Sequence, residues 1–160
     1  MKNLIISLAI LIFGFSCNEG EFYEEGLIDF NSVEHLNDCP VNILDSGNED
    51  RFLVINSIEE LESQIFWIND DTNPCLSLKE ALDIDFSNYT LLVGKKRIPH
   101  IEGELISESV FRSGSAEYTY EVSLWNGGYT AIGQFRFGVI IPKIPDGTGV
   151  NFDIEIRERV

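Results

Sequence analysis

The chain has 160 residues, with 27 Asp or Glu against 11 Lys or Arg and a formal net charge of −16 at pH 7. This length is enough for one domain with a single sizeable core. Such an acidic excess argues against nucleic acid as a partner, because phosphate backbones are bound by clustered Lys and Arg. We therefore expect an acidic, single-domain protein that does not bind nucleic acid.

The first seventeen residues have the pattern of an export sequence. Lys2 precedes an apolar run from Leu4 to Phe15, and Ser16 places a small residue directly before Cys17. The run is too short to span a bilayer as a helix, which takes about 20 residues. A small residue before a cysteine resembles the lipobox of bacterial lipoproteins, with Gly14 at the position that usually holds Leu. The resemblance implies cleavage before Cys17 and acylation of its thiol, and plain secretion is the alternative.

This cleavage site predicts the organisation of the chain. Residues 1–16 are expected to be the signal peptide, residues 17–26 the lipidated cysteine with an acidic tether, and residues 27–160 a single globular domain. More than one acyl chain makes anchoring in a membrane stable. Glu19 and Glu21 resemble the tags that send some lipoproteins to the outer membrane. We therefore expect a lipid-anchored protein of the cell envelope, on the periplasmic or outer face of the outer membrane.

Two cysteines, Cys39 and Cys75, remain once Cys17 carries lipid. An even pair in an exported domain is a disulfide candidate. A bond that closes such a long loop would contribute about 4 kcal/mol in the chain-entropy model. Two buried free thiols are the alternative, and the wide separation of the cysteines does not favour a redox role.

A helix is predicted after two short strands in the first half of the domain. The apolar runs at 41–44 and 52–55 have strand length. Ser57 is followed three residues later by Glu60, which is the spacing of a capping box. Apolar residues then recur at helical intervals, so one face of this helix should pack on the core. These residues are Ile58, Leu61, Ile65 and Ile68.

From Ile84 onward the pattern is that of β-strands. Asn126-Gly127-Gly128 predicts a turn, Gly133 and Gly138 are candidates for bulges, and residues 150–157 alternate between apolar and polar. The predicted fold class is α+β, a mainly antiparallel β-sheet of meander or sandwich type with one principal amphipathic helix packed on it. The strands are expected at residues 89–93, 104–112, 117–125, 130–141 and 150–157.

The best candidate for a metal site is the polar segment from Asn69 to Glu80. Counted from Asn69, Glu80 falls at position twelve, as in an EF-hand loop. Pro74 stands at position six, where the sharp turn requires Gly, and Asn69 supplies no charge. A polar turn after the helix is therefore favoured over a cation site, and we expect no metal and no cofactor.

No residue pattern indicates catalysis. Neither His35 nor His100 has a metal-ligand spacing, and the chain lacks a Gly-x-Ser-x-Gly step and a phosphate-binding loop. The lack of these patterns favours a non-enzymatic protein. A nucleophile and its base can come from distant parts of the sequence and meet only in the fold, so an enzyme stays the alternative.

Two groups of residues are candidates for binding a partner. Lys95, Lys96 and Arg97 form the basic cluster of the chain, either as an exposed strand end or as a contact for an acidic partner or a lipid headgroup. Aromatic residues near the 126–128 turn either pack across strands or form a surface for a protein or a glycan. These aromatic residues are Tyr118, Tyr120, Trp125 and Tyr129.

Two segments have a familiar order. The first segment is Leu53-Val-Ile55-Asn-Ser57 with Glu59-Glu-Leu61, and the second is Ile84-Asp85-Phe86-Ser87 with Tyr89-Thr-Leu-Leu-Val93-Gly94. In this order they are similar to the C-terminal domain of the PrcB-like protease-complex subunits. The likeness extends over residues 51–158, although residues 97–103 replace that family's Gly-rich step. It implies an accessory domain without catalysis that docks or stabilises another envelope protein. A surface lipoprotein that binds glycans or cations, and an envelope hydrolase with a dispersed site, are the alternatives.

Overall fold

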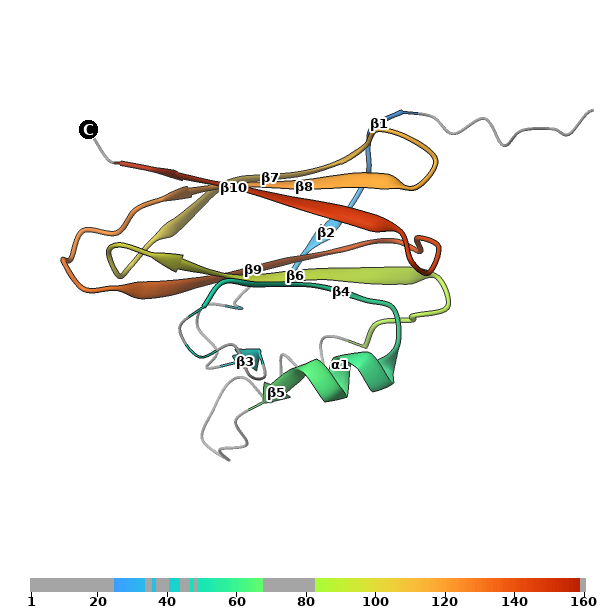
Figure 1. The fold of residues 1–160 in the computed structure, drawn as a ribbon, viewed down its shortest axis with the longest axis horizontal. Coiled ribbons are helices and arrows are strands. Elements are labelled where there is room, and N and C mark those ends of the chain that lie inside the picture. Colours follow the sequence, from blue (N-terminus) through green and yellow to red (C-terminus); the bar gives the residue numbers. More distant parts are fainter. Residues whose placement is uncertain are drawn as a thin grey trace, which may run out of the picture.

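The computed structural model describes residues 25–33, 36, 41–43, 47, 49–67 and 83–158. In this part of the chain two four-stranded sheets face each other as a β-sandwich (Figure 1). The α+β fold class with mainly antiparallel strands is thereby confirmed, in its sandwich form. The three cysteines Cys17, Cys39 and Cys75, together with His35 and the 69–80 segment, lie outside the described residues.

The strands fall into three sheets. Sheet A has the order β1 (Gly26–Leu27), β7 (Glu104–Arg112), β8 (Glu117–Trp125) and β10 (Gly149–Arg157). Sheet B has the order β2 (Asn31–Ser32), β9 (Gly133–Pro142), β6 (Tyr89–Ile98) and β4 (Arg51–Ile55). A two-stranded ribbon, β3 (Val41–Ile43) with β5 (Ile65–Trp67), lies with helix α1 (Ile58–Gln64) beneath sheet B (Figure 1).

The last strand runs parallel to its neighbour. β10 pairs with β8 from Gly149 beside Glu117 to Arg157 beside Trp125, whereas the other strand pairs of the described chain are antiparallel. β9 belongs to the opposite sheet, so the chain crosses from sheet A to sheet B and back between β8 and β10. The alternation predicted for residues 150–157 is confirmed, because Val150, Phe152, Ile154 and Ile156 are half-buried between more exposed residues.

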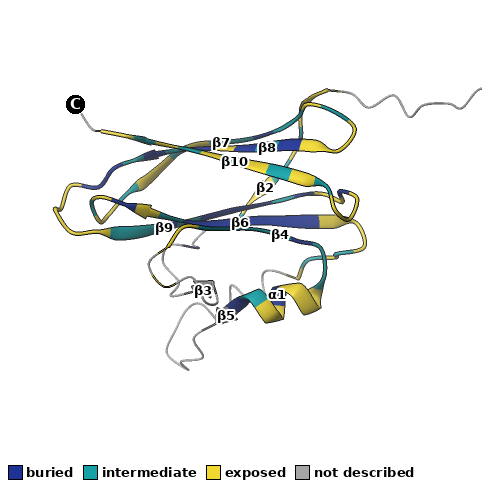
Figure 2. Cartoon of the chain, in the orientation of Figure 1, coloured by how far each residue is buried: buried dark blue, intermediate teal, exposed yellow. Residues whose placement is uncertain are grey.

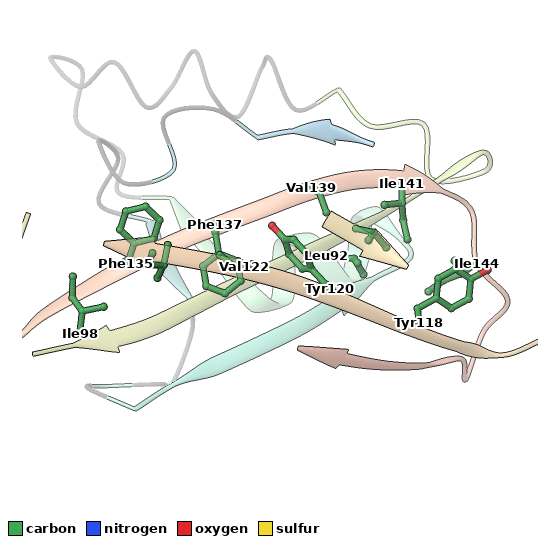
Figure 3. Packing of buried hydrophobic residues seen from close by; sticks show 12 residues of the cluster. Leu92, Ile98, Tyr118, Tyr120, Val122, Phe135, Phe137, Val139, Ile141 and Ile144 are labelled. Atoms are coloured by element: carbon green, nitrogen blue, oxygen red, sulfur yellow. The ribbon is translucent and has the colours of Figure 1, made fainter. Parts of the chain in front are cut away.

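The main core lies between the two sheets. Buried side chains of β6 and β9 meet those of β8 and Val110 of β7, and Figure 2 shows β6 largely in dark blue. Tyr120 is at the centre of this core, with its ring edge-on to Phe137 at 5.7 Å between centroids (Figure 3). At the side of the sandwich, Phe52 of β4 stacks on Phe152 of β10 at 5.2 Å. Each fully buried large apolar side chain contributes about 1.5–3 kcal/mol, so this cluster is the principal source of stability.

A smaller core lies between the outer face of sheet B and α1. Leu61 of the helix packs there with Ile55 and Leu91. The predicted cap is confirmed, because the Ser57 hydroxyl oxygen accepts from the Glu60 amide at 3.1 Å and the Glu60 carboxylate accepts from the Asn56 amide at 2.7 Å. Among the described residues no helix is both long and apolar enough to cross a membrane.

Three local predictions were wrong. The helix ends at Gln64 rather than continuing toward Ile68, because the β-branched and aromatic residues of β5 pair with β3 instead. Gly133 and Gly138 are paired in regular register with β6, and the irregularity lies in β7, between Leu105 and Ser107.

The Asn126-Gly127-Gly128 step does not fold β9 back onto β8. It begins the connection that crosses from sheet A to sheet B. The dipeptide preference for a tight turn was overridden here by the packing of the two sheets.

Candidate docking surface

Two loops meet at one end of the sandwich. The connection between β6 and β7 (residues 99–103) and the connection between β8 and β9 (residues 126–132) lie together at the left of Figure 1. Ile101 and Tyr129 form an isolated β-bridge between them. The described chain begins at the opposite end, where β1 pairs with the last two residues of β7. We call the end with the two loops the loop end.

Asn126 fixes the two loops to the body of the protein. Its side chain is only 2% exposed. The carboxamide oxygen accepts from the backbone amide of His100 at 3.0 Å, and the carboxamide nitrogen donates to the carboxylate of Glu158 at 2.8 Å. The backbone amide of Asn126 donates to the carbonyl of Arg157 at 2.8 Å. One buried residue therefore connects both loops to the end of β10.

Gly127 and His100 complete this junction. A Cβ atom at Gly127 would overlap the carbonyl oxygen of Ile101, so only glycine allows the two loops to approach this closely. The His100 Nδ1 atom lies 3.1 Å from the carbonyl oxygen of Gly127 and 3.3 Å from the carboxamide nitrogen of Asn126. His100 thus serves to hold the loops, a role that its sequence position beside Pro99 did not predict.

Apolar side chains are exposed on these loops. Ile132 is 62% exposed and Tyr129 is 60% exposed, and Ile101 beside them is also exposed. A contiguous patch of exposed apolar side chains often marks a protein interface, whereas single exposed apolar residues are normal on a protein surface. Ile101, Tyr129 and Ile132 are named here the apolar loop cluster.

A row of cations crosses sheet B near the same end. The strand register places Arg51 of β4 beside Lys95 of β6, and Lys95 beside Arg136 of β9. Lys95 is only 4% exposed, and its ammonium group donates to the carbonyl of Gly47 at 2.8 Å. Burial lowers the pKa of Lys95, with Arg136 and Arg51 adding to that effect and Asp50 opposing it. Burial also lowers the pKa of Arg136. The Arg51 guanidinium donates to the carboxamide oxygen of Gln64 at 3.2 Å.

The three members of the predicted basic cluster have different surroundings, and the alternation of β6 places Lys96 on the opposite face from Lys95 and Arg97. Lys95 belongs to the cationic row, Lys96 pairs with Asp50 at 2.6 Å, and Arg97 is exposed. Asp50 also accepts from the backbone amide of Arg97 at 2.7 Å. Burial opposes ionisation of Asp50, but the hydrogen bonds from Lys96 and Arg97 outweigh it and lower the pKa.

Two adjoining hollows lie beside Arg97. The larger, of about 620 Å³, is lined by Glu49, Asp50, Arg97, Ile98, Pro99 and Ile132. The smaller, of about 420 Å³, is lined by Arg97, Ile132, Gly133, Gln134 and Arg136. Because the two hollows share Arg97 and Ile132, we describe them as one groove, the Arg97 groove.

The four aromatic candidates are not brought together. Tyr118 and Tyr120 are buried core residues on β8 (Figure 3), and Trp125 is half-buried at the end of that strand. Of the four, Tyr129 is the exposed member and belongs to the apolar loop cluster. Alternation along β8 would have predicted that Tyr118 and Tyr120 share one face, but the sequence does not say which face is buried.

A separate polar group lies between the sheets. Glu108 accepts a hydrogen bond from the Tyr120 hydroxyl and another, at 2.9 Å, from the Ser32 hydroxyl. Burial raises the pKa of Glu108, and the two hydrogen bonds partly oppose that shift. The pKa of Tyr120 is also raised, by burial and by the neighbouring carboxylate. These contacts link β2 to sheet A and occupy the polar atoms, so the group has a structural role.

Comparisons with known proteins give no relative. No family model matches the chain, and neither a curated protein nor a solved structure matches it. The similarity to PrcB-like subunits therefore stays a prediction from the sequence. Among the described residues no three His, Cys, Asp or Glu side chains are grouped as metal ligands.

Proposed function

We propose that the protein is a lipoprotein of the cell envelope that acts as an accessory module, without catalysis, and docks or stabilises another envelope protein. The lipid on Cys17 holds it on the outer membrane. The Cys39–Cys75 disulfide stabilises the domain outside the cytoplasm.

One observation carries this proposal. The exposed apolar loop cluster and the Arg97 groove are at the end of the sandwich opposite the point where the described chain begins. Strand β6 has 10 residues, which span about 33 Å, so the two ends are well separated. Residues 17–24 reach at most about 28 Å when fully extended. An anchor on Cys17 would thus keep the domain near the membrane and leave the loop end available to a neighbouring protein.

Two experiments test this proposal. Metabolic labelling with a fatty-acid analogue should label the wild-type chain and the control Ser16→Ala, and should fail in Cys17→Ala. Labelling that persists in Cys17→Ala would contradict the lipid anchor. Crosslinking in native membranes should then capture a partner with the wild type and lose it with Ile132→Ser. Equal capture by Ile132→Ser and by the wild type would contradict docking at the loop end.

A further inference from the structure

We infer that the partner docked at the loop end adds a β-strand to the edge of β10 that faces away from β8, through an extended segment whose apolar side chains alternate with basic ones. The inference rests on the proposed function and names the chemistry of the segment that docks. β10 ends at the loop end, where the Asn126 carboxamide donates to Glu158 at 2.8 Å. A partner that covers the apolar loop cluster can therefore continue along residues 152–156 of β10. We call this side of β10 its outer edge.

The outer edge of β10 has backbone groups that can pair with another strand. β10 is the last strand in the order of sheet A, and within the described chain it pairs with β8 alone. The carbonyl of Arg157 accepts from the Asn126 amide, so Arg157 directs its backbone groups toward β8. Because backbone groups point alternately to the two sides of a strand, Phe152, Ile154 and Ile156 direct their N–H and C=O groups to the outer edge. A segment that adds a strand would satisfy these groups.

This edge lacks the features by which many proteins block strand addition. β10 pairs with β8 in regular register from Gly149 to Arg157, without a bulge or a proline. Its charged residues alternate with the half-buried apolar ones and are exposed, so none of them points between the two sheets. On the other side of sheet A, by contrast, β7 has an irregularity between Leu105 and Ser107. β10 is therefore the better edge for an added strand.

The chain itself covers the other side of the sandwich with an extended segment. Residues 26–32 pair first with β7 of sheet A, through β1, and then with β9 of sheet B, through β2. Ile28 and Phe30, between these two short strands, pack against the main core. On the side of β10 and β4 no described strand pairs with either outer edge, and the apolar side chains of β10 stay half-buried. An added strand with apolar side chains would bury them further.

The charges around β10 favour a basic segment. The charged residues of β8 and β10 are four acids and one base, and the base, Arg157, is paired with Glu155 at 2.5 Å. A Lys or Arg on an added strand would lie beside Asp153 or Glu155, and opposite charges on neighbouring strands stabilise a sheet. The four acids are Glu117, Glu121, Asp153 and Glu155.

A second copy of the chain fits this edge less well. Two β10 strands paired edge to edge would bring together two molecules that each have a formal net charge of −16, with the acids of both strands side by side. Like charges on directly opposed positions destabilise a sheet. A basic segment is instead attracted by the same charges, and this attraction weakens as salt screens them.

A peptide-binding assay with the full-length chain in detergent tests the inference. The probe is a short fluorescein-labelled peptide of alternating Val and Lys, followed by fluorescence anisotropy at physiological salt. Two further peptides carry N-methyl groups on the amides of either the Val or the Lys residues. Since backbone groups alternate along a strand, only one of these two sets of amides can face β10. One methylated peptide should therefore bind at least about tenfold more weakly than the other.

Variants locate the binding on β10. Ile154→Pro removes an N–H that faces the outer edge and none that bonds to β8, a position where a strand tolerates proline. It should weaken the unmethylated peptide by about tenfold or more, and by at least about threefold more than Ile154→Ala, which keeps the N–H. Circular dichroism and urea unfolding verify that both variants are folded.

A charge reversal provides a matched comparison. Asp153→Lys places a positive charge beside the added strand and should weaken the peptide by about fivefold. Glu62→Lys makes the same change of charge on the exposed surface of α1 and should leave binding within about twofold.

Four results would overturn the inference. They are no binding of the unmethylated peptide, equal binding of the two methylated peptides, equal loss in Asp153→Lys and Glu62→Lys, and a dimer in sedimentation that Ile154→Pro dissociates, which would make a second copy the occupant. Any of these together with labelling that requires Cys17 and capture that requires Ile132 would leave the proposed function intact. Failure of labelling and capture would instead remove the proposed function itself.

Discussion

Replacing Asn126 by Ala should destabilise the protein more than its small size suggests. The substitution removes the oxygen that accepts from the His100 amide and the nitrogen that donates to Glu158. An unpartnered buried amide costs about 1–3 kcal/mol, and the bond to the exposed Glu158 adds less than about 1 kcal/mol. We therefore expect the free energy of unfolding to fall by about 2–3 kcal/mol.

Urea unfolding followed by tryptophan fluorescence measures this loss, because Trp125 precedes the mutated position. Asn88→Ala is the matched control, since the exposed Asn88 carboxamide makes one hydrogen bond, to Asp85 at 2.7 Å. The control should lose less than about 1 kcal/mol. Equal losses in the two variants would refute the role assigned to Asn126 in holding the loop end.

Three further predictions concern the core and the helix. Glu108 has a raised pKa in the folded state, so its contribution to stability is complete below its ordinary pKa and is lost as the pH rises through the folded pKa. Glu108→Gln should therefore flatten the pH dependence of the free energy of unfolding, measured by urea titration. An unchanged pH dependence would contradict the burial of Glu108. Gly94→Ala would place a Cβ 2.5 Å from ring carbons of Phe137 and should lower the free energy of unfolding by about 1–3 kcal/mol. Calorimetry measures this loss, and a neutral effect would mean that the Phe137 ring moves freely. Ser57→Ala removes the helix cap and should cost about 1 kcal/mol in chemical denaturation, more than Ser63→Ala on the exposed helix surface.

Local patterns in the sequence predicted most of the strands. Residues 104–112 and 117–125 were predicted with the bounds that the structure gives, because each combines a strand-length apolar pattern with flanking polar or glycine residues. The cap at Ser57 followed from its spacing to Glu60. These features depend on residues that are close in the sequence, so they can be predicted from local patterns.

Features that depend on distant residues were missed. The parallel pairing of β10 with β8 requires β9 to lie in the other sheet, and no local pattern encodes that crossing. The cationic row forms only because the register aligns Arg51, Lys95 and Arg136 from three strands. From the sequence, only the run Lys95-Lys96-Arg97 was visible, and strand alternation places Lys96 on the opposite face of β6 from Lys95 and Arg97.

The most direct test of docking at the loop end is site-specific photo-crosslinking in native membranes. A photoreactive residue is introduced either at position 132, in the apolar loop cluster, or at position 146, in the loop between β9 and β10 at the opposite end. We expect a discrete crosslinked partner from position 132 and none from position 146. Crosslinks of equal yield from both positions, or from position 146 alone, would contradict it.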